Sequence, residues 1–344
     1  MIKYDNDYEM SYAELTAREQ EIYEQQVIKN EKKFLHSLTN IDFAEVLKRG
    51  TDFIRDKLYN LPQTIFLIKY KGHTIIGRKI RSILSIQNKI NAINCSRITA
   101  SMILGVLKAK KCSERDICVE YYPFTEQERI QLFEEVKRDL ALEIVFPYQE
   151  RYFKNNQVEK TGRCGWSLNP TKVKYLGYGE EHIRRYTNNI LKGIVFPGCK
   201  IYDPACSTGQ FLHSIKTKFP DVVTIGGDLS EQMIDYAKKY LDFWECCNAK
   251  DSRLKEKSVD ILFLRFLNDQ VVSKFQAKNI LPSVLKKVKE GGCVIAFGHT
   301  PVLLTKRQFK HYGLQIDSCI AYDAVENDIF QYYIMRKKYE HSNN

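Results

Sequence analysis

A short predicted strand followed by a turn of small residues is the first place where this chain could bind a ligand. Residues 200–212 read Lys-Ile-Tyr-Asp-Pro-Ala-Cys-Ser-Thr-Gly-Gln-Phe-Leu, a pattern typical of a strand ending in an acid, a tight turn and a helix. Small residues let a backbone pass close under a nucleoside, and free N–H groups at the helix start favour polar or anionic ligand groups. The ligand contacts expected here are Asp203, Ala205, Cys206, Ser207, Gly209 and Phe211.

A second acid ends the next predicted strand. Residues 224–230 read Thr-Ile-Gly-Gly-Asp-Leu-Ser, which places an acid 25 residues after Asp203. An acidic side chain at the tip of the second strand can accept both ribose hydroxyls of an adenosine. A polar side chain following the third strand could reach the adenine. The further ligand contacts that we expect are Asp228, Leu229, Met233, Asn248 and Ala249.

The elements that position these residues alternate between strand and helix. Residues 259–266 are typical of a buried central strand, and a predicted helix then leads to a strand over 291–297. Two closing strands are expected near 313–316 and 330–335. This order predicts an α/β domain with a doubly wound, mostly parallel sheet over residues 175–340. No GxGxxG follows the first strand, which argues against an NAD-type fold.

This order of motifs resembles the class I S-adenosylmethionine-dependent methyltransferases over about residues 175–338. The run Asp-Pro-Ala-Cys-Ser-Thr-Gly-Gln-Phe-Leu is similar to their first motif, with Ser207 where many members have glycine. The resemblance implies a Rossmann-like fold and S-adenosylmethionine as the cofactor. It also implies that Asp228 holds the ribose and that residues 248–249 contact the adenine.

DNA adenine methyltransferases carry Asn-Pro-Pro-Tyr or a relative after the fourth strand, where it holds the amine that is methylated. In this chain residues 264–269 read Leu-Arg-Phe-Leu-Asn-Asp, without a proline. The pair Asn169-Pro170 lies upstream, in the wrong place. DNA base methylation is therefore not expected.

A narrower resemblance comes from residues 178–187, Tyr-Gly-Glu-Glu-His-Ile-Arg-Arg-Tyr-Thr, together with the first motif and residues 227–230. They look like the aminocarboxypropyltransferase branch, which includes isonocardicin synthase and the microcin C maturation enzyme. Such enzymes direct the attack to the γ-carbon of the methionine part and release methylthioadenosine. In the microcin C case the acceptor is the phosphate of a peptidyl-adenylate, so the resemblance implies a role in antibiotic biosynthesis.

A sulfonium activates three carbons, and geometry decides which one is attacked. A pocket that presents the γ-carbon must hold the amino acid end of the cofactor firmly, and an arginine could bind its carboxylate bidentately. A phosphate acceptor is already ionised and needs no general base. The catalytic candidates are Tyr178, Arg185 and Tyr186 before the first strand, and Arg265 and Asn268 after the fourth.

Positive charge is concentrated in one segment of the N-terminal half. The chain carries a net charge of +11, and residues 62–113 contain ten Lys and Arg but no Asp or Glu. A segment without acids suggests a surface that meets phosphate. We expect the acceptor, a phosphate-bearing nucleotide or peptidyl-nucleotide, to be bound by Lys69, Lys71, Arg78 and Lys79.

Three regions are expected along the chain. Residues 1–155 form a smaller, basic, mixed α/β domain for acceptor binding or an accessory role, residues 156–174 a linker or substrate loop, and residues 175–340 the cofactor domain. Within the first region, helices are predicted over 11–38, 42–59 and about 80–110, with strands over 64–70 and 117–122. A capping box of Thr125 and Glu128 should open a further helix to about residue 142.

Three alternatives stay open: a methyltransferase acting on a small molecule or protein, an RNA-modifying enzyme whose basic segment binds RNA, and a binding module without catalysis. The ten cysteines show no CxxC or Cys/His pattern with zinc spacing, so no metal is expected. No apolar run approaches the roughly 18 residues of a membrane span. No signal peptide is apparent, and we expect a cytoplasmic protein without a membrane partner.

Overall fold

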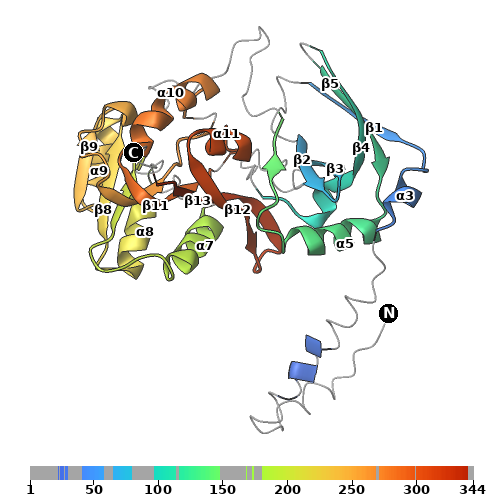
Figure 1. The fold of residues 1–344 in the computed structure, drawn as a ribbon, viewed down its shortest axis with the longest axis horizontal. Coiled ribbons are helices and arrows are strands. Elements are labelled where there is room, and N and C mark those ends of the chain that lie inside the picture. Colours follow the sequence, from blue (N-terminus) through green and yellow to red (C-terminus); the bar gives the residue numbers. More distant parts are fainter. Residues whose placement is uncertain are drawn as a thin grey trace, which may run out of the picture. The chain divides into compact units, whose positions relative to one another are not determined.

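The computed structural model describes residues 22, 24–26, 28–29, 41–57, 65–79, 97–113, 116–147, 168, 173, 180–268, 271–298 and 300–339. Residues 1–43 form one unit, and residues 44–344 form a second compact unit. The second unit contains two β-sheets, which Figure 1 shows with their helices. The predicted linker over 156–174 lies outside the described residues except for residues 168 and 173. The division of roles between residues 1–155 and 175–340 stays a prediction.

The C-terminal sheet has seven strands in the order β12-β13-β11-β10-β7-β8-β9. Strands β7 to β11 are parallel, whereas β13 is antiparallel to both of its neighbours. This confirms the predicted Rossmann-like sheet, and the strand order reverses between β7 and β10, where such folds bind ligands. The strands are β7 (Lys200–Asp203), β8 (Val223–Asp228), β9 (Phe243–Cys246), β10 (Val259–Phe263), β11 (Val288–Ala296), β12 (Leu314–Asp323) and β13 (Asp328–Lys337).

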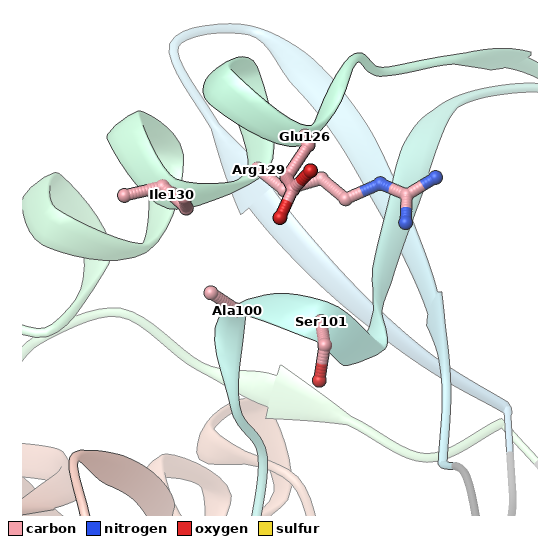
Figure 2. A pocket seen from close by; sticks show the side chains of 5 residues that line it. All are labelled: Ala100, Ser101, Glu126, Arg129 and Ile130. Atoms are coloured by element: carbon pink, nitrogen blue, oxygen red, sulfur yellow. The ribbon is translucent and has the colours of Figure 1, made fainter. Parts of the chain in front are cut away.

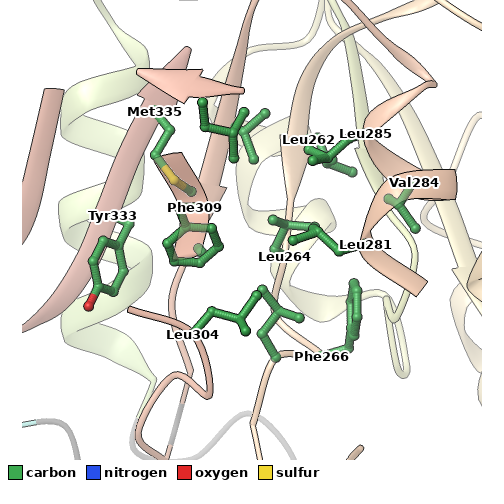
Figure 3. Packing of buried hydrophobic residues seen from close by; sticks show 14 of the residues in the cluster. Leu262, Leu264, Phe266, Leu281, Val284, Leu285, Leu304, Phe309, Tyr333 and Met335 are labelled. Carbon is green, nitrogen blue, oxygen red and sulfur yellow. The ribbon is translucent and has the colours of Figure 1, made fainter. Parts of the chain in front are cut away.

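Helices cover both faces of this sheet. One face packs against α7 (Glu181–Leu191), α8 (Gln210–Lys218) and α9 (Glu231–Ala237). The other packs against α10 (Lys274–Leu285) and α11 (Lys306–His311), as Figure 3 shows. Along β10, Ile261 and Phe263 point into the first core and Leu262 into the second, because side chains alternate across a strand. Apart from Asp260, the strand is therefore apolar, as expected of a buried central strand.

The N-terminal sheet is antiparallel, with six strands in the order β1-β5-β4-β3-β2-β6. Its elements are α3 (Phe43–Val46), β1 (Asp52–Lys57), β2 (Ile65–Tyr70), β3 (His73–Arg78), η1 (Ala100–Met102), β4 (Ile103–Cys112), β5 (Asp116–Pro123), α5 (Glu126–Val136) and β6 (Ile144–Val145). The strands predicted over 64–70 and 117–122 are confirmed. The capping box is confirmed too, since Thr125 and Glu128 exchange both hydrogen bonds.

Two of the predicted helices are wrong in their described parts. The helix expected over 42–59 ends at Val46, and residues 52–57 instead pair with β5. In the helix expected over 80–110, residues 103–110 belong to β4, which pairs with β3 and β5. Both segments gain ladder hydrogen bonds from neighbouring strands of the sheet, and these override local helix spacing. Residues 80–96 and most of 11–38 lie outside the described residues.

Gly105 on β4 leaves no space for a side chain. A Cβ atom there would lie 1.9 Å from the carbonyl oxygen of Tyr122 on β5. Because this atom belongs to a paired backbone, we expect Gly105→Ala to lower the free energy of unfolding by about 3 kcal/mol or more, measured in urea. The control is Gly193→Ala, where the nearest atom is 3.9 Å away, and a change within about 0.5 kcal/mol is expected. Equal stability of the two variants would contradict the packing.

The β12–β13 hairpin also bonds to segments of the N-terminal region. Ile98 and Ile329 form an antiparallel bridge with N–O distances of 2.7 and 2.9 Å. The Gln331 side chain donates to the carbonyl oxygen of Ile144 at 2.8 Å. The Glu143 carboxylate accepts a hydrogen bond from the Tyr333 hydroxyl at 3.1 Å. The last hairpin is thus shared between the two sheets.

Asp328, at the start of β13, is buried and forms an ion pair with Arg97. Burial raises the pKa of Asp328 to about 6, although Arg97 opposes the rise. Since the ordinary value is about 3.9, the folded protein keeps a proton at pH values where the unfolded chain has released it. The stabilising contribution is therefore complete below about pH 4 and is lost as the pH rises through 6.

We therefore expect wild type to lose about 2 kcal/mol of unfolding free energy relative to Asp328→Asn between pH 4 and pH 7. Urea denaturation of both proteins at the two pH values measures this difference. Asp317→Asn is the control, because Asp317 pairs with Arg336 at a more exposed position. A difference between wild type and Asp328→Asn that stays constant with pH would contradict the assignment.

Candidate cofactor site

The turn after β7 is held in shape by hydrogen bonds that its backbone N–H groups donate. The Asp203 carboxylate accepts a hydrogen bond from the Ala205 N–H at 3.0 Å, and the Cys206 N–H donates to Gly227 on β8 at 2.8 Å. The turn includes two residues in left-handed conformation, Ser207 with φ 55° and Gly209 with φ 77°. The first motif predicted from the sequence therefore forms a tight strand–turn–helix corner, with α8 beginning directly after it.

Asp228 lies beside this turn, at the end of β8. Its two carboxylate oxygens accept hydrogen bonds from the N–H groups of Ser207 at 3.0 Å and Ser230 at 2.9 Å. Burial raises the pKa of Asp228, and these N–H groups act against the rise. Each oxygen retains acceptor capacity for a second donor. The carboxylate is thus fixed in place and can accept two ribose hydroxyls.

Met233 and Leu229, the other residues predicted near the ribose, differ in their surroundings. Met233 is buried, and the Ser207 hydroxyl donates to its sulfur at 3.5 Å. Leu229 is exposed on the loop before α9. Met233 therefore packs under the turn, whereas Leu229 is available to cover a ligand.

The predicted adenine position follows β9, where η3 (Ala249–Asp251) begins. The Asn248 side-chain oxygen accepts a hydrogen bond from the Lys250 N–H at 3.1 Å, which leaves its amide nitrogen to donate to a base. Glu245, which the sequence analysis did not predict, stabilises this loop through hydrogen bonds. Its carboxylate accepts hydrogen bonds from the Tyr202 hydroxyl at 3.2 Å and the Arg253 N–H at 3.0 Å.

Arg265 follows β10 and is bonded to the residue that ends β7 and to the residue that precedes α7. It donates to Asp203 at 3.1 Å and to both carboxylate oxygens of Glu180 at 3.2 Å. Its guanidinium lies over the Phe211 ring, 4.6 Å from the centroid. Burial lowers the pKa of Arg265, but Glu180 and then Asp203 outweigh this effect and raise the pKa overall. The sequence analysis missed Glu180, because an acid before a helix ordinarily indicates only a favourable helix start.

The other catalytic candidates have different neighbours. The Asn268 amide donates to the Arg265 carbonyl oxygen at 2.7 Å and so stabilises the turn after β10. Arg185 forms an ion pair with Asp323 at the end of β12. The remaining two are Tyr186, whose ring packs edge-on against Phe330 and Tyr332, and Tyr178, which lies outside the described residues. The catalytic roles of these four residues stay predictions.

The four cations predicted to bind the acceptor lie on one hairpin but not in one patch. Lys69 and Lys71 are at its turn, and Lys71 pairs with Glu135 at 2.8 Å. Arg78 and Lys79 lie at the opposite end, because Arg78 is opposite Ile65 in the register. A strand of this length spans about 17–20 Å. A single phosphate therefore cannot contact both pairs.

A hollow of about 350 Å³ lies between η1 and α5, lined by Ala100, Ser101, Glu126, Arg129 and Ile130 (Figure 2). The Nε atom of Arg129 is buried and has no hydrogen-bond partner among the described residues. Glu126 places a carboxylate in the same hollow, so the lining is not purely cationic. None of these residues belongs to the predicted acceptor set.

The described ranges contain no cluster of three or more His, Cys, Asp or Glu side chains that could hold a metal ion. Among the helices in these ranges, none has the length and apolar character needed to cross a membrane.

Comparison with known proteins identifies a matching family model and a relative of similar sequence. Residues 201–292 match the family model described as a methyltransferase domain. Isonocardicin synthase from Nocardia uniformis subsp. tsuyamanensis is 30% identical over 280 residues, which cover 80% of this chain and 92% of the relative.

Solved methyltransferase structures also match. One from Methanosarcina mazei is 14% identical with a TM-score of 0.36, covering 44% of this chain and 98% of that one. The plantazolicin methyltransferase, in complex with a pentazolic analog and SAH, is 13% identical with a TM-score of 0.38, covering 51% of this chain and 94% of its own.

Proposed function

This chain belongs to the isonocardicin synthase family of S-adenosylmethionine-dependent transferases, and we propose that it transfers the 3-amino-3-carboxypropyl group of the cofactor to a phosphate-bearing acceptor. The proposal is carried by Arg265, which is buried and clamped between two carboxylates at the strand ends of the cofactor fold. An arginine fixed in this way is suited to hold the amino acid end of S-adenosylmethionine, which γ-carbon transfer requires.

The residues at this corner fit S-adenosylmethionine. Asp228 supplies acceptors for two ribose hydroxyls, and the Asn248 amide can donate to the adenine. Arg265 offers a guanidinium to the carboxylate of the methionine part. When bound, the cofactor supplies an alkyl carbon activated by a positively charged sulfur.

In the proposed step, an acceptor oxygen forms a bond to the γ-carbon while the bond from that carbon to sulfur breaks. The electron pair of the broken bond stays on sulfur, so the products are an alkylated acceptor and neutral methylthioadenosine. An ionised phosphate oxygen needs no proton removed before it attacks. The contribution of the protein is therefore to bind and orient both partners and to exclude water from the reacting carbon.

We propose the phosphate of a peptidyl-adenylate as the acceptor, in the maturation of a peptide–nucleotide antibiotic. The sequence resemblance to the microcin C maturation enzyme and the acid-free segment over 62–113 support this choice. Because Lys69 and Lys71 are separated from Arg78 and Lys79, we propose that only one pair contacts the phosphate. The turn pair is the more accessible, since Lys79 is buried.

The test is to incubate the protein with S-adenosylmethionine and a peptidyl-adenylate and to identify both products by mass spectrometry. We expect methylthioadenosine and an acceptor heavier by one aminocarboxypropyl group. Asp228→Asn should abolish both products, whereas the exposed Asp235→Asn on α9 should leave them unchanged. S-adenosylhomocysteine as the nucleoside product would overturn the proposal.

A methyltransferase acting on a small molecule or RNA is the second candidate, and the match of residues 201–292 to a methyltransferase domain favours it. The same experiment separates the two functions, because methyl transfer releases S-adenosylhomocysteine. An RNA substrate would in addition show binding that weakens steeply with salt.

A further inference from the structure

Glu180 immediately precedes α7, yet its carboxylate is not used by that helix. Ser, Thr, Asp or Asn at this position ordinarily accepts a hydrogen bond from the first turn, whereas the Glu180 side chain makes no such bond to the described helix. Both oxygens instead accept hydrogen bonds from Arg265, at 3.2 Å each. The side chain is only 13% exposed. The Glu180 carboxylate thus points toward the ends of β7 and β10, where Asp203 and Arg265 lie. We call the region formed by Glu180, Asp203, Arg265 and Asp228 the cofactor corner.

The cluster that Glu180 completes has an unbalanced charge. Glu180 and Asp203 share the single guanidinium of Arg265, so two carboxylates face one cation. Asp228 adds a further carboxylate on the neighbouring strand β8. Buried negative charge without a partner is costly, and a ligand that brings a cationic group to this corner removes the imbalance.

The amino acid end of S-adenosylmethionine has the matching charges, an ammonium with three N–H donors and a carboxylate. We propose that Glu180 is a cofactor-binding residue that receives the α-ammonium group of S-adenosylmethionine, while Arg265 binds its carboxylate. This inference rests on the cofactor and not on which of its groups is transferred. Because Glu180 precedes α7 and Arg265 follows β10, the amino acid end is held from two elements, which fixes the direction of the γ-carbon.

Calorimetric titration of the full chain with S-adenosylhomocysteine and with its deamino analogue tests the proposal without turnover. The analogue keeps the carboxylate and lacks the ammonium. We expect wild type to bind the parent compound at least about tenfold more tightly, as a hydrogen bond between charged groups implies. Glu180→Gln should lose at least about tenfold toward the parent compound and nothing toward the analogue. The control is Glu181→Gln, at a position that is 64% exposed.

Equal losses toward both ligands would overturn the proposal, since Glu180 would then act only by positioning Arg265. An unchanged affinity of Glu180→Gln for the parent compound would overturn it as well. If Glu180→Gln does not fold, Glu180→Asp keeps the charge and withdraws it by one methylene group. That variant should discriminate less between the two ligands than wild type, and undiminished discrimination contradicts the assignment. These binding results stand even if the transferred group proves to be methyl.

Discussion

Replacing Arg265 with methionine should lower the free energy of unfolding by about 3–5 kcal/mol at neutral pH, because it leaves buried carboxylates without their cation. Asp203 has no exposed side-chain surface and Glu180 very little. Methionine preserves much of the packing against Phe211, so the lost free energy of unfolding reflects mainly the removal of the positive charge. Urea denaturation at pH 7 measures it.

The pH dependence separates this explanation from a simple packing defect. Burial raises the pKa of Asp203, and Arg265 opposes that rise in wild type. Without the guanidinium, Asp203 is protonated at higher pH in the folded protein, so the deficit of Arg265→Met should shrink as the pH falls toward about 4. Arg336→Met is the control, because Arg336 pairs with Asp317 at an exposed position and such pairs contribute about 0–1 kcal/mol. A deficit as small as that of the control would refute the role given to Arg265.

Replacing Asp228 with asparagine should weaken S-adenosylhomocysteine binding by about 100-fold or more. Two hydrogen bonds to a charged acceptor contribute about 1.5–3 kcal/mol each, and each 1.4 kcal/mol corresponds to about tenfold in affinity. Isothermal titration measures the loss. Asp235→Asn, a change on the exposed side of α9, should bind normally.

Comparing ligands with and without the ribose 2′-hydroxyl tests whether Asp228 acts on the sugar. Wild type should bind methylthioadenosine more tightly than its 2′-deoxy analogue, because a charged hydrogen bond is lost with the hydroxyl. In Asp228→Asn this preference should largely disappear. If the variant retains the full preference for the hydroxyl, another residue recognises the ribose.

The arrangement of the turn after β7 and of Asp228 beside it could be predicted, because it depends on residues close in sequence and on adjacent strands. Asp203 and the small residues of the turn lie within one short segment, and Asp228 ends the adjacent parallel strand. Parallel strands bring their carboxyl ends to the same edge of a sheet, so the motif order alone implies that these side chains meet. The capping box of Thr125 and Glu128 is equally local, since its two residues are three apart.

The features that the sequence analysis missed depend on partners distant in the chain. Residues 52–57 and 103–110 have apolar spacing that suits a helix or a strand, and only pairing across the N-terminal sheet decides between them. Glu180 meets Arg265 across 85 positions. The separation of Lys71 from Arg78 follows from hairpin register, which places residues of similar sequence number at opposite ends.

Because the β12–β13 hairpin contacts segments of the N-terminal region, it affects the order in which the protein can fold during synthesis. Ile98 and the segment at Glu143 and Ile144 take their partners from residues 329–333, near the end of the chain. During synthesis, these N-terminal contacts cannot form until residues 329–333 have left the ribosome. The region predicted to bind the acceptor therefore reaches its final form only when the cofactor sheet has received its last antiparallel strands, and a truncated product would lack both.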